Sequence, residues 1–239
     1  MFFIQLARPR TGRGRKSTCL LRYSVGIDFW QILCQKVLET GFRIIVPRSA
    51  MADLLTLDSL RRRMAAMFSL YDDAISTMDL GHVNHFERDG VLPIAFSLFH
   101  YVNVHDASFM LLTGDVPLWN EGWQTRIGMS IDDHGKHRTV DEMVHQRMGD
   151  LEAFAEYMTA VYQRTMDWLH RIVPEDLDRI VVPRPFPPQI ASTFSARVAG
   201  PDGLTVLDGV ECWLYQHGLR HMGEIELARG LVGLGGMTS

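Results

Sequence analysis

Cysteine is scarce in this chain of 239 residues. Its three thiols, Cys19, Cys34 and Cys212, include no CxxC pair. A small and odd number of cysteines argues against a disulfide framework and is typical of proteins in a reducing compartment. We therefore expect a cytoplasmic protein without structural disulfides.

Long apolar runs are absent as well. The longest, such as residues 91–99, are about half as long as the roughly 18 residues that a membrane-spanning helix needs. The sequence has no internal repeat, no low-complexity tract and no clear secretory signal. With 46% hydrophobic and 22% charged residues, its composition is that of an ordinary soluble globular protein, and we expect no membrane partner.

Charge is distributed unevenly along the chain. Residues 1–50 contain nine Lys and Arg against two acidic side chains, a net charge of +7. Residues 51–239 contain 15 basic against 26 acidic side chains, a net charge of −11. An acidic body binds nucleic acid poorly, so we expect no nucleic-acid partner. The contrast also suggests two separate segments.

The basic segment, residues 1–50, has three interpretations: an arm for nucleic acid, a targeting peptide, or translated upstream sequence that is not part of the native protein. It holds no phosphate-binding loop, because Arg15 stands before Lys16 where such a loop needs glycine. A clean helical pattern opens directly after Met51. We therefore favour a misplaced start codon, with Met51 as the native start and residues 1–50 contributing little to the core.

Residues 51–239 contain four stretches in which apolar side chains recur every three or four residues. This spacing places the apolar side chains on one face of a helix, and that face has to be buried. Four such helices can close a bundle, so we predict an all-α, four-helix bundle domain over residues 51–239. The predicted helices span residues 54–78, 93–113, 150–172 and 206–232, and Thr139 and Glu142 form the capping-box pattern at the start of a short extra helix.

The links between the predicted helices are unequal in length. Residues 114–138 and 173–205 are long and rich in Gly, Pro and Trp. Links of that length can form a lid over one end of a bundle. Within the second link, parts of residues 191–206 could pair as short strands, with Pro201-Asp-Gly203 as their turn.

Two histidines stand inside the apolar face of the last predicted helix. His217 and His221 are four residues apart, so their imidazoles lie one above the other and can converge on one metal ion. Burying two imidazoles costs free energy unless each finds a partner, and a divalent cation satisfies both. The alternative is a pair of core histidines that are hydrogen-bonded to backbone or carboxylate groups.

A third ligand has to come from another helix. His100 lies on the buried face of the second predicted helix, whereas His105 is about 140° further round the helix. One regular helix cannot aim both at the same ion, so we predict His100 as the ligand. His105 and Asp106 then either support the ligands from behind or face solvent.

Other polar groups near these histidines are secondary candidates. Glu224 follows His221 by three residues on the same face, and a buried carboxylate there needs either the metal or a histidine N–H. Cys212 precedes His217 by five residues, so it points elsewhere and is interpreted as a packed thiol. The remaining histidines fall in links or near helix ends, where a surface position is expected: His82, His85, His134, His137, His145 and His170.

Two of these stretches resemble a known family. Pro93-Ile-Ala-Phe-Ser-Leu-Phe-His100-Tyr is similar to the second-helix motif of DinB-like proteins. Trp213-Leu-Tyr-Gln-His217-Gly-Leu-Arg-His221-Met-Gly-Glu-Ile is similar to their last-helix motif, HxxxHxG. The resemblance covers about residues 52–239 and implies a bundle with up-down-down-up topology. It also implies that His100, His217 and His221 hold a metal, often zinc or nickel.

The resemblance bears on function as well. The wider superfamily includes mycothiol-dependent maleylpyruvate isomerase and bacillithiol transferases, members without known activity, and proteins induced by DNA damage. Three histidines leave a coordination position open, as in catalytic zinc sites. An open metal can make a nucleophile of a thiol or a water molecule near neutral pH.

We therefore expect a metal-dependent thiol S-transferase or isomerase that acts on a small molecule, with a low-molecular-weight thiol as cofactor and Glu224 orienting a ligand. Arg126, Arg164 and Arg220 are candidates for binding an anionic thiol. One alternative is a hydrolase that uses metal-bound hydroxide. Another is a non-enzymatic, stress-related protein in which the metal organises a ligand pocket or a homodimer, and a homodimer is the protein partner that we expect.

Overall fold

The structure, a computed structural model, describes residues 5–7, 43–45 and 48–237. It divides into two units, residues 1–57 and 58–239, and helix α2 (Arg48–Ser76) runs across the boundary. In the first unit, β1 (Gln5–Ala7) pairs antiparallel with β2 (Arg43–Ile45). The interpretations of residues 1–50 concern a segment that lies mostly outside the described residues, and they stay predictions.

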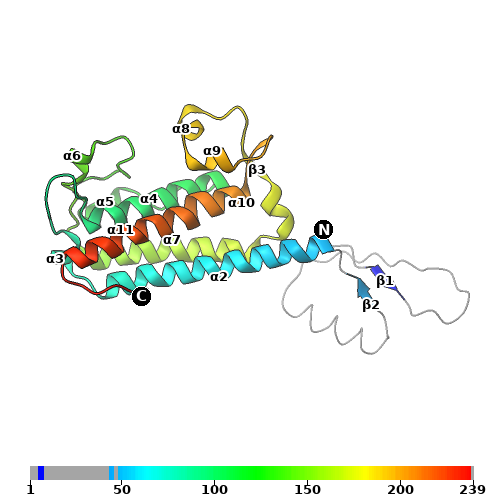
Figure 1. The fold of residues 1–239 in the computed structure, drawn as a ribbon, viewed down its shortest axis with the longest axis horizontal. Helices are drawn as coiled ribbons and strands as arrows, with labels where there is room; N and C mark the ends of the chain where they lie inside the picture. Colours follow the sequence, from blue (N-terminus) through cyan, green and yellow to red (C-terminus); the bar gives the residue numbers. More distant parts are fainter. Residues whose placement is uncertain (1–4, 8–42, 46–47, 238–239) are drawn as a thin grey trace, which may run out of the picture. The chain divides into compact units, whose positions relative to one another are not determined.

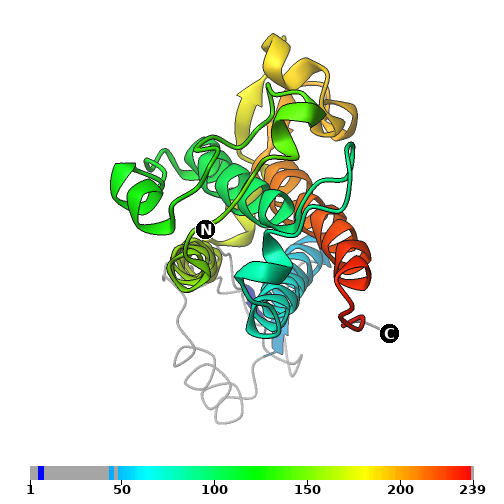
Figure 2. The same cartoon turned by 90° about the vertical axis from the view of Figure 1, so that its left-hand side faces the viewer.

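The second unit is predominantly helical, which confirms the all-α class. Figures 1 and 2 show its long helices side by side. The helices are α2 from residue 58 onward, α4 (Ile94–Thr113), α7 (Leu151–Arg171), and a last segment that joins α10 (Val206–Gly209), the π-helix η2 (Val210–Gln216) and α11 (His217–Leu231). Their ends fall within two residues of the predicted ones, except that α2 begins at Arg48 instead of residue 54.

Shorter elements occupy the links between the long helices. The first link holds α3 (Leu80–Val83), and the second holds α5 (Glu121–Ile127) and α6 (Val140–Met143). The third link holds the 3₁₀-helix η1 (Pro174–Asp178), β3 (Ile180–Pro183), α8 (Pro188–Ala191), α9 (Phe194–Val198) and β4 (Gly203–Thr205). Within the described part of the chain, no helix combines the length and the apolar character that a membrane crossing requires.

The expectation that parts of residues 191–206 pair with each other as short strands is wrong. β4 is a strand, but its antiparallel partner is β3, and most of residues 188–198 is helical in α8 and α9. The indole Nε1 of Trp213 on η2 donates a hydrogen bond of 3.0 Å to Ser195 Oγ on α9. This bond holds α9 against the last helical segment.

Local signals in the sequence set the helix ends. Thr139 and Glu142 form the expected capping box at the start of α6. The carboxylate of Asp150 accepts the Ala153 N–H at 2.8 Å and caps the start of α7. α4 ends at Gly114, whose φ of 85° is the left-handed conformation that favours glycine.

The apolar faces predicted for the helices form the core, with three exceptions. Leu111 on α4 and Leu231 on α11 are exposed, at 41% and 43% of their surface. Glu224 on α11, which the sequence predicts as a buried carboxylate, is also exposed, with 49% of its side chain accessible. The others that were predicted on these faces are buried or half-buried, and aromatic rings fill the centre. Phe68 stacks on Tyr162 with ring centroids 3.9 Å apart, and Tyr71 stacks on Tyr101 at 4.7 Å.

Hydrogen bonds from arginine tie the long helices together. Arg61 Nε on α2 donates to the carbonyl of Leu169 on α7 at 2.8 Å. Arg229 on α11 is almost completely buried, and its Nη1 donates to Ala74 O at 3.3 Å and to Thr77 Oγ1 at 2.8 Å near the end of α2. A cation at the carboxyl end of a helix also interacts favourably with the helix dipole.

His105 on α4 belongs to a buried polar network of the core. Its Nε2 lies 2.8 Å from Thr165 Oγ1 on α7, and its Nδ1 lies 3.1 Å from the hydroxyl of Tyr101. His105 and its neighbour Asp106 are both completely buried, so the solvent-facing alternative for these two residues is wrong. Burial first, and the charge of Arg164 second, lower the pKa of His105 from its ordinary 6.5 to about 3.

We predict that His105 destabilises the protein in acid. In the unfolded chain this imidazole takes up a proton near pH 6.5, but in the folded protein only near pH 3. The unfolded state therefore binds more protons as the pH falls between these values, and each pH unit costs up to about 1.4 kcal/mol of folding free energy. The variant His105→Gln should flatten the slope of unfolding free energy against pH by about that amount, measured by urea unfolding of metal-free protein between about pH 6 and pH 4.

The matched control for this measurement is His145→Gln, because His145 is exposed. It should leave the slope as in the parent protein. A slope that is also unchanged in His105→Gln would contradict the buried, neutral state of His105.

Candidate metal centre

Three histidines from two neighbouring helices lie together in the second unit. His100 comes from α4, and His217 and His221 come from α11. One ligand nitrogen of each lies within 4.8 Å of the others, an arrangement that could hold a metal ion. The ring centroids are 4.6 Å apart for His217 and His221, and 5.3 Å and 4.8 Å from these two to His100. The structure thus brings together the three residues that the sequence predicts as ligands.

Gly218 allows α11 to approach its neighbours closely beside His217. A Cβ atom at this position would lie 2.4 Å from Met67 Sδ on α2 and 2.7 Å from the Tyr101 hydroxyl oxygen on α4. The Tyr71 hydroxyl donates to the Gly218 carbonyl at 2.8 Å. Because only glycine leaves room for these contacts, this residue sets the distance at which α11 presents its histidines to α4.

The helical segment before His217 is irregular, which the sequence does not predict. Residues 210–216 form a π-helix, and the Tyr101 hydroxyl donates to the Leu214 carbonyl at 3.2 Å. A π-helix has a wider turn than an α-helix, so the apolar stripe before His217 and the histidines after it do not follow one 3.6-residue period. Short π-helical segments are frequent at functional sites, but no residue pattern in this sequence predicts one.

The hydrogen bonds of His100 and His221 determine which ring nitrogen is free. His100 Nδ1 bonds to the main-chain carbonyl of His134, which can only accept, so Nδ1 carries the proton. His221 Nδ1 lies 2.7 Å from Glu224 Oε2, and this carboxylate also accepts the Ser97 hydroxyl at 3.2 Å. The hydrogen bond from His221 lowers the pKa of Glu224 and keeps it ionised. In both histidines the lone pair is therefore on Nε2.

His217 differs from the other two histidines in its hydrogen bonds. Its Nε2 lies 2.9 Å from His221 Nε2. Two nitrogens that bind one tetrahedral zinc ion at about 2.0–2.1 Å are roughly 3.3 Å apart, so this pair is close to ligand spacing. Its Nδ1 is buried without a hydrogen-bond partner among the described residues. An ion bound at Nε2 would not change this, so the spacing of the two Nε2 atoms is the observation that supports a metal here.

Burial keeps two of these imidazoles neutral. Burial first, and the adjacent His221 second, lower the pKa of His100 to about 4 and that of His217 to about 2. A metal binds the neutral imidazole, so a low pKa means that few protons compete for the nitrogen. Convergent Nε2 atoms, in rings whose Nδ1–H groups meet a carbonyl and a carboxylate, fit a metal such as zinc.

The other residues that were singled out in the sequence have different environments. Cys212 is buried and burial raises its pKa to about 11, in agreement with a packed thiol. Arg126 pairs with Glu156 at 2.6 Å, and Arg164 pairs with Asp106 at 2.5 Å. Neither guanidinium is therefore available to an anionic ligand without breaking an ion pair.

The sequence predicts His134 at the surface and leaves the place of Asp106 open, and the structure gives both a part in supporting the surroundings of the site. His134 was expected at the surface, but its main-chain carbonyl holds His100 and its side chain is half-buried. Asp106 accepts the backbone N–H groups of Leu118 and Trp119 at 3.0 Å and 2.8 Å, and the Tyr157 hydroxyl at 3.0 Å. These bonds fix the backbone at Leu118 and Trp119, near the start of the link that contains His134.

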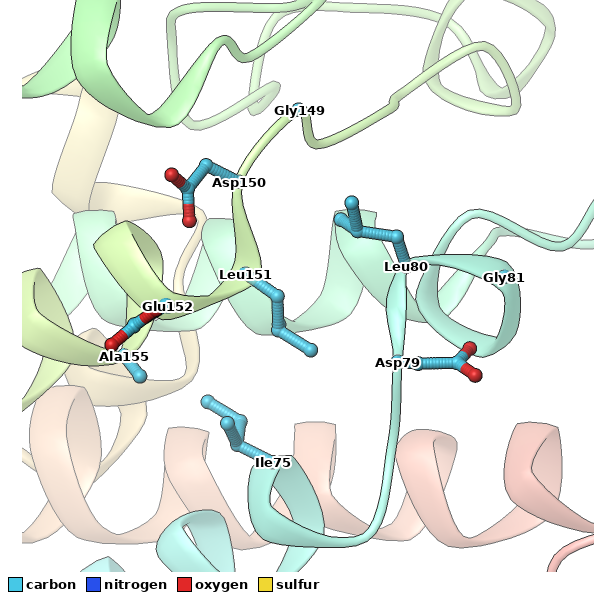
Figure 3. A pocket seen from close by; sticks show the side chains of 9 residues that line it. All are labelled: Ile75, Asp79, Leu80, Gly81, Gly149, Asp150, Leu151, Glu152 and Ala155. Carbon is cyan, nitrogen blue, oxygen red and sulfur yellow. The ribbon is translucent and has the colours of Figure 1, made fainter.

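A cavity of about 800 Å³ lies elsewhere, between the end of α2 and the start of α7. Figure 3 shows the apolar side chains of Ile75, Leu80 and Leu151 turned toward it. The carboxylates of Asp79 and Asp150 on its rim already cap helices α3 and α7. None of the three clustered histidines lines it.

Comparisons with known proteins bear on the fold alone. No protein-family model matches the sequence. No curated protein matches it either. Among solved structures, a conserved protein from Enterococcus faecalis is similar, with a TM-score of 0.53 and 15% sequence identity over 79% of this chain and 99% of that chain. At this identity the likeness shows a shared fold.

Proposed function

We propose that this chain is a metal-dependent enzyme of the DinB-like superfamily, built as an up-down-down-up four-helix bundle. His100, His217 and His221 would hold the ion. The observation that carries the proposal is the convergence of three imidazoles in which two Nδ1–H groups are already bonded, so that Nε2 is left to bind. Histidines that ligate metals commonly have such a bond at the other nitrogen.

Zinc or nickel is the proposed metal. Imidazole is a good ligand for both ions. Three protein ligands leave one tetrahedral position open, which is the arrangement of catalytic zinc sites. When bound, the metal would supply a Lewis acid that lowers the pKa of a thiol or a water molecule in this position.

Thiol S-transfer or a thiol-dependent isomerisation of a small molecule is the proposed reaction. Glu224 would orient His221 through Nδ1, as it does in this structure at 2.7 Å. Arg220 would bind the anionic part of the thiol. It is exposed, it has no ion pair among the described residues, and its charge lowers the pKa of His217. Arg126 and Arg164, by contrast, are engaged by carboxylates.

We predict that the purified protein binds one divalent metal ion per chain, measured by elemental analysis after dialysis. His217→Ala and His221→Ala should each abolish stoichiometric binding, because two remaining imidazoles hold the ion too weakly. His105→Gln is the matched control, since it replaces a buried histidine outside the triad, and it should bind one ion.

The competing interpretation, core histidines satisfied by hydrogen bonds, predicts no metal in the parent protein and only a modest loss of stability in the variants. A parent protein without metal, or a His217→Ala variant that binds a full equivalent, would overturn the proposed site.

A second prediction concerns the reaction. The metal-loaded protein should conjugate mycothiol, bacillithiol or glutathione to a chloroarene electrophile faster than the metal-free protein. Arg220→Gln should raise KM for the thiol about tenfold with little change in kcat, because it removes one hydrogen bond to a charged group. Arg126→Gln is the control, and KM should stay within about twofold of the parent.

Absence of turnover with all three thiols would refute the transferase assignment. Metal-dependent ester hydrolysis in the same preparation would point to a hydrolase instead. Metal binding without either activity would favour the non-enzymatic, stress-related binding protein.

A further inference from the structure

Residues 133–138 form a turn just before α6, and one main-chain carbonyl of this turn contacts the histidine cluster. The carbonyl is that of His134, and it accepts the Nδ1–H of His100 on α4. The two residues are 34 positions apart in the chain, so this bond depends on how the turn is built.

The turn is closed by its own side chains. Asp133 Oδ1 accepts the Gly135 N–H at 2.7 Å, and Asp133 Oδ2 accepts Arg138 Nε and Nη2 at 3.0 Å and 2.7 Å. The Arg138 N–H donates back to the Gly135 carbonyl at 3.0 Å. These bonds fix the backbone on both sides of His134.

Gly135 allows the turn to lie in close contact with Phe96, the aromatic side chain that packs against His100. Its φ is +72°, and a Cβ atom there would lie 2.8 Å from Phe96 Cε2 and 3.3 Å from Met143 Sδ. Phe96 in turn stacks on His100, with ring centroids 5.2 Å apart and planes inclined by 25°. No side chain fits at this position without moving the backbone or the ring.

The segment that carries the turn is anchored before and after it. The Gln146 amide bonds to both the N–H and the carbonyl of Ile131, at 2.9 Å and 2.8 Å. The Asn84 amide does the same for Met148, at 2.8 Å and 2.7 Å. The turn is therefore a supported part of the fold, and its carbonyl has a defined place.

The imidazole of His134 is engaged differently. Its Nδ1 accepts the Lys136 N–H at 3.1 Å, within the turn. Its ring lies 6.4 Å from that of His100 at an interplanar angle of 83°, and it is not among the three clustered histidines. The backbone of His134, and not its side chain, contacts the site.

We propose that the turn of residues 133–138 is a positioning element that fixes His100 as an Nε2 ligand through the His134 carbonyl, with no part for the His134 imidazole. This inference rests on the proposed metal site. A hydrogen bond at one ring nitrogen decides which nitrogen carries the proton and how the ring is oriented. Loss of such a support commonly lowers metal affinity ten- to a hundredfold.

The test compares three variants. Gly135→Ala forces the turn away from Phe96 and His100. Gly90→Ala is its control, because Gly90 also has a positive φ, +79°, but an added Cβ meets nothing within 4 Å. His134→Asn removes the imidazole and keeps both the carbonyl and an acceptor for the Lys136 N–H.

Two measurements are made on each variant. Long-range ¹H–¹⁵N spectra of the metal-free protein report the tautomer of His100 without any metal. Competition with a chelator reports the zinc dissociation constant. Binding by the parent protein tests the proposed function, whereas the differences between variants and the tautomer test this inference.

We expect the His100 Nδ1–H tautomer in the parent protein, in Gly90→Ala and in His134→Asn, with zinc affinities within about twofold of one another. In Gly135→Ala the single tautomer should be lost and zinc affinity should fall about tenfold or more. The inference is overturned if Gly135→Ala keeps the tautomer and the affinity of Gly90→Ala. It is equally overturned if His134→Asn shows the losses expected of Gly135→Ala.

Discussion

Three imidazoles lie between α4 and α11, with His221 buried and His100 and His217 half-buried, and the proposed function depends on how their nitrogens are satisfied. A buried polar group without a partner destabilises the fold, and each of these rings has two nitrogens to satisfy. The Nδ1 atom of His100 bonds to a main-chain carbonyl, and that of His221 bonds to a carboxylate. Their Nε2 atoms remain available to a ligand between the three rings. His217 Nε2 lies 2.9 Å from His221 Nε2, close to the spacing of two ligands on one ion. We propose that a divalent cation completes this arrangement.

Polar groups deeper in the core keep the two helices in place around the histidines. The Tyr101 hydroxyl bonds to the Leu214 carbonyl of the π-helix and lies 3.1 Å from His105, which in turn reaches Thr165 on α7. Asp106, one residue further, holds Arg164 at 2.5 Å. These bonds join α4 to its neighbours at fixed points, so that the position of His100 relative to α11 depends on side chains that do not touch it.

Much of this arrangement follows from the sequence, for identifiable reasons. The helices can be predicted because apolar periodicity and capping residues are local signals. His217 and His221 can be predicted as site residues because they interrupt an apolar face. The 140° between His100 and His105 favours His100, and the structure places His100 beside the pair. The π-helix and the partner of β4 were not predicted, and the choice between burial and exposure of Asp106 stayed open, because these features depend on residues that are distant in the chain. The His134 carbonyl has no side-chain signature at all.

X-ray absorption at the metal edge of the zinc-loaded protein tests the central claim most directly. A three-histidine site should give multiple-scattering features of three imidazoles with zinc–nitrogen distances of about 2.0–2.1 Å, and one further light ligand from solvent. A spectrum with sulfur at about 2.3 Å would contradict this site, and so would one with fewer than three imidazoles.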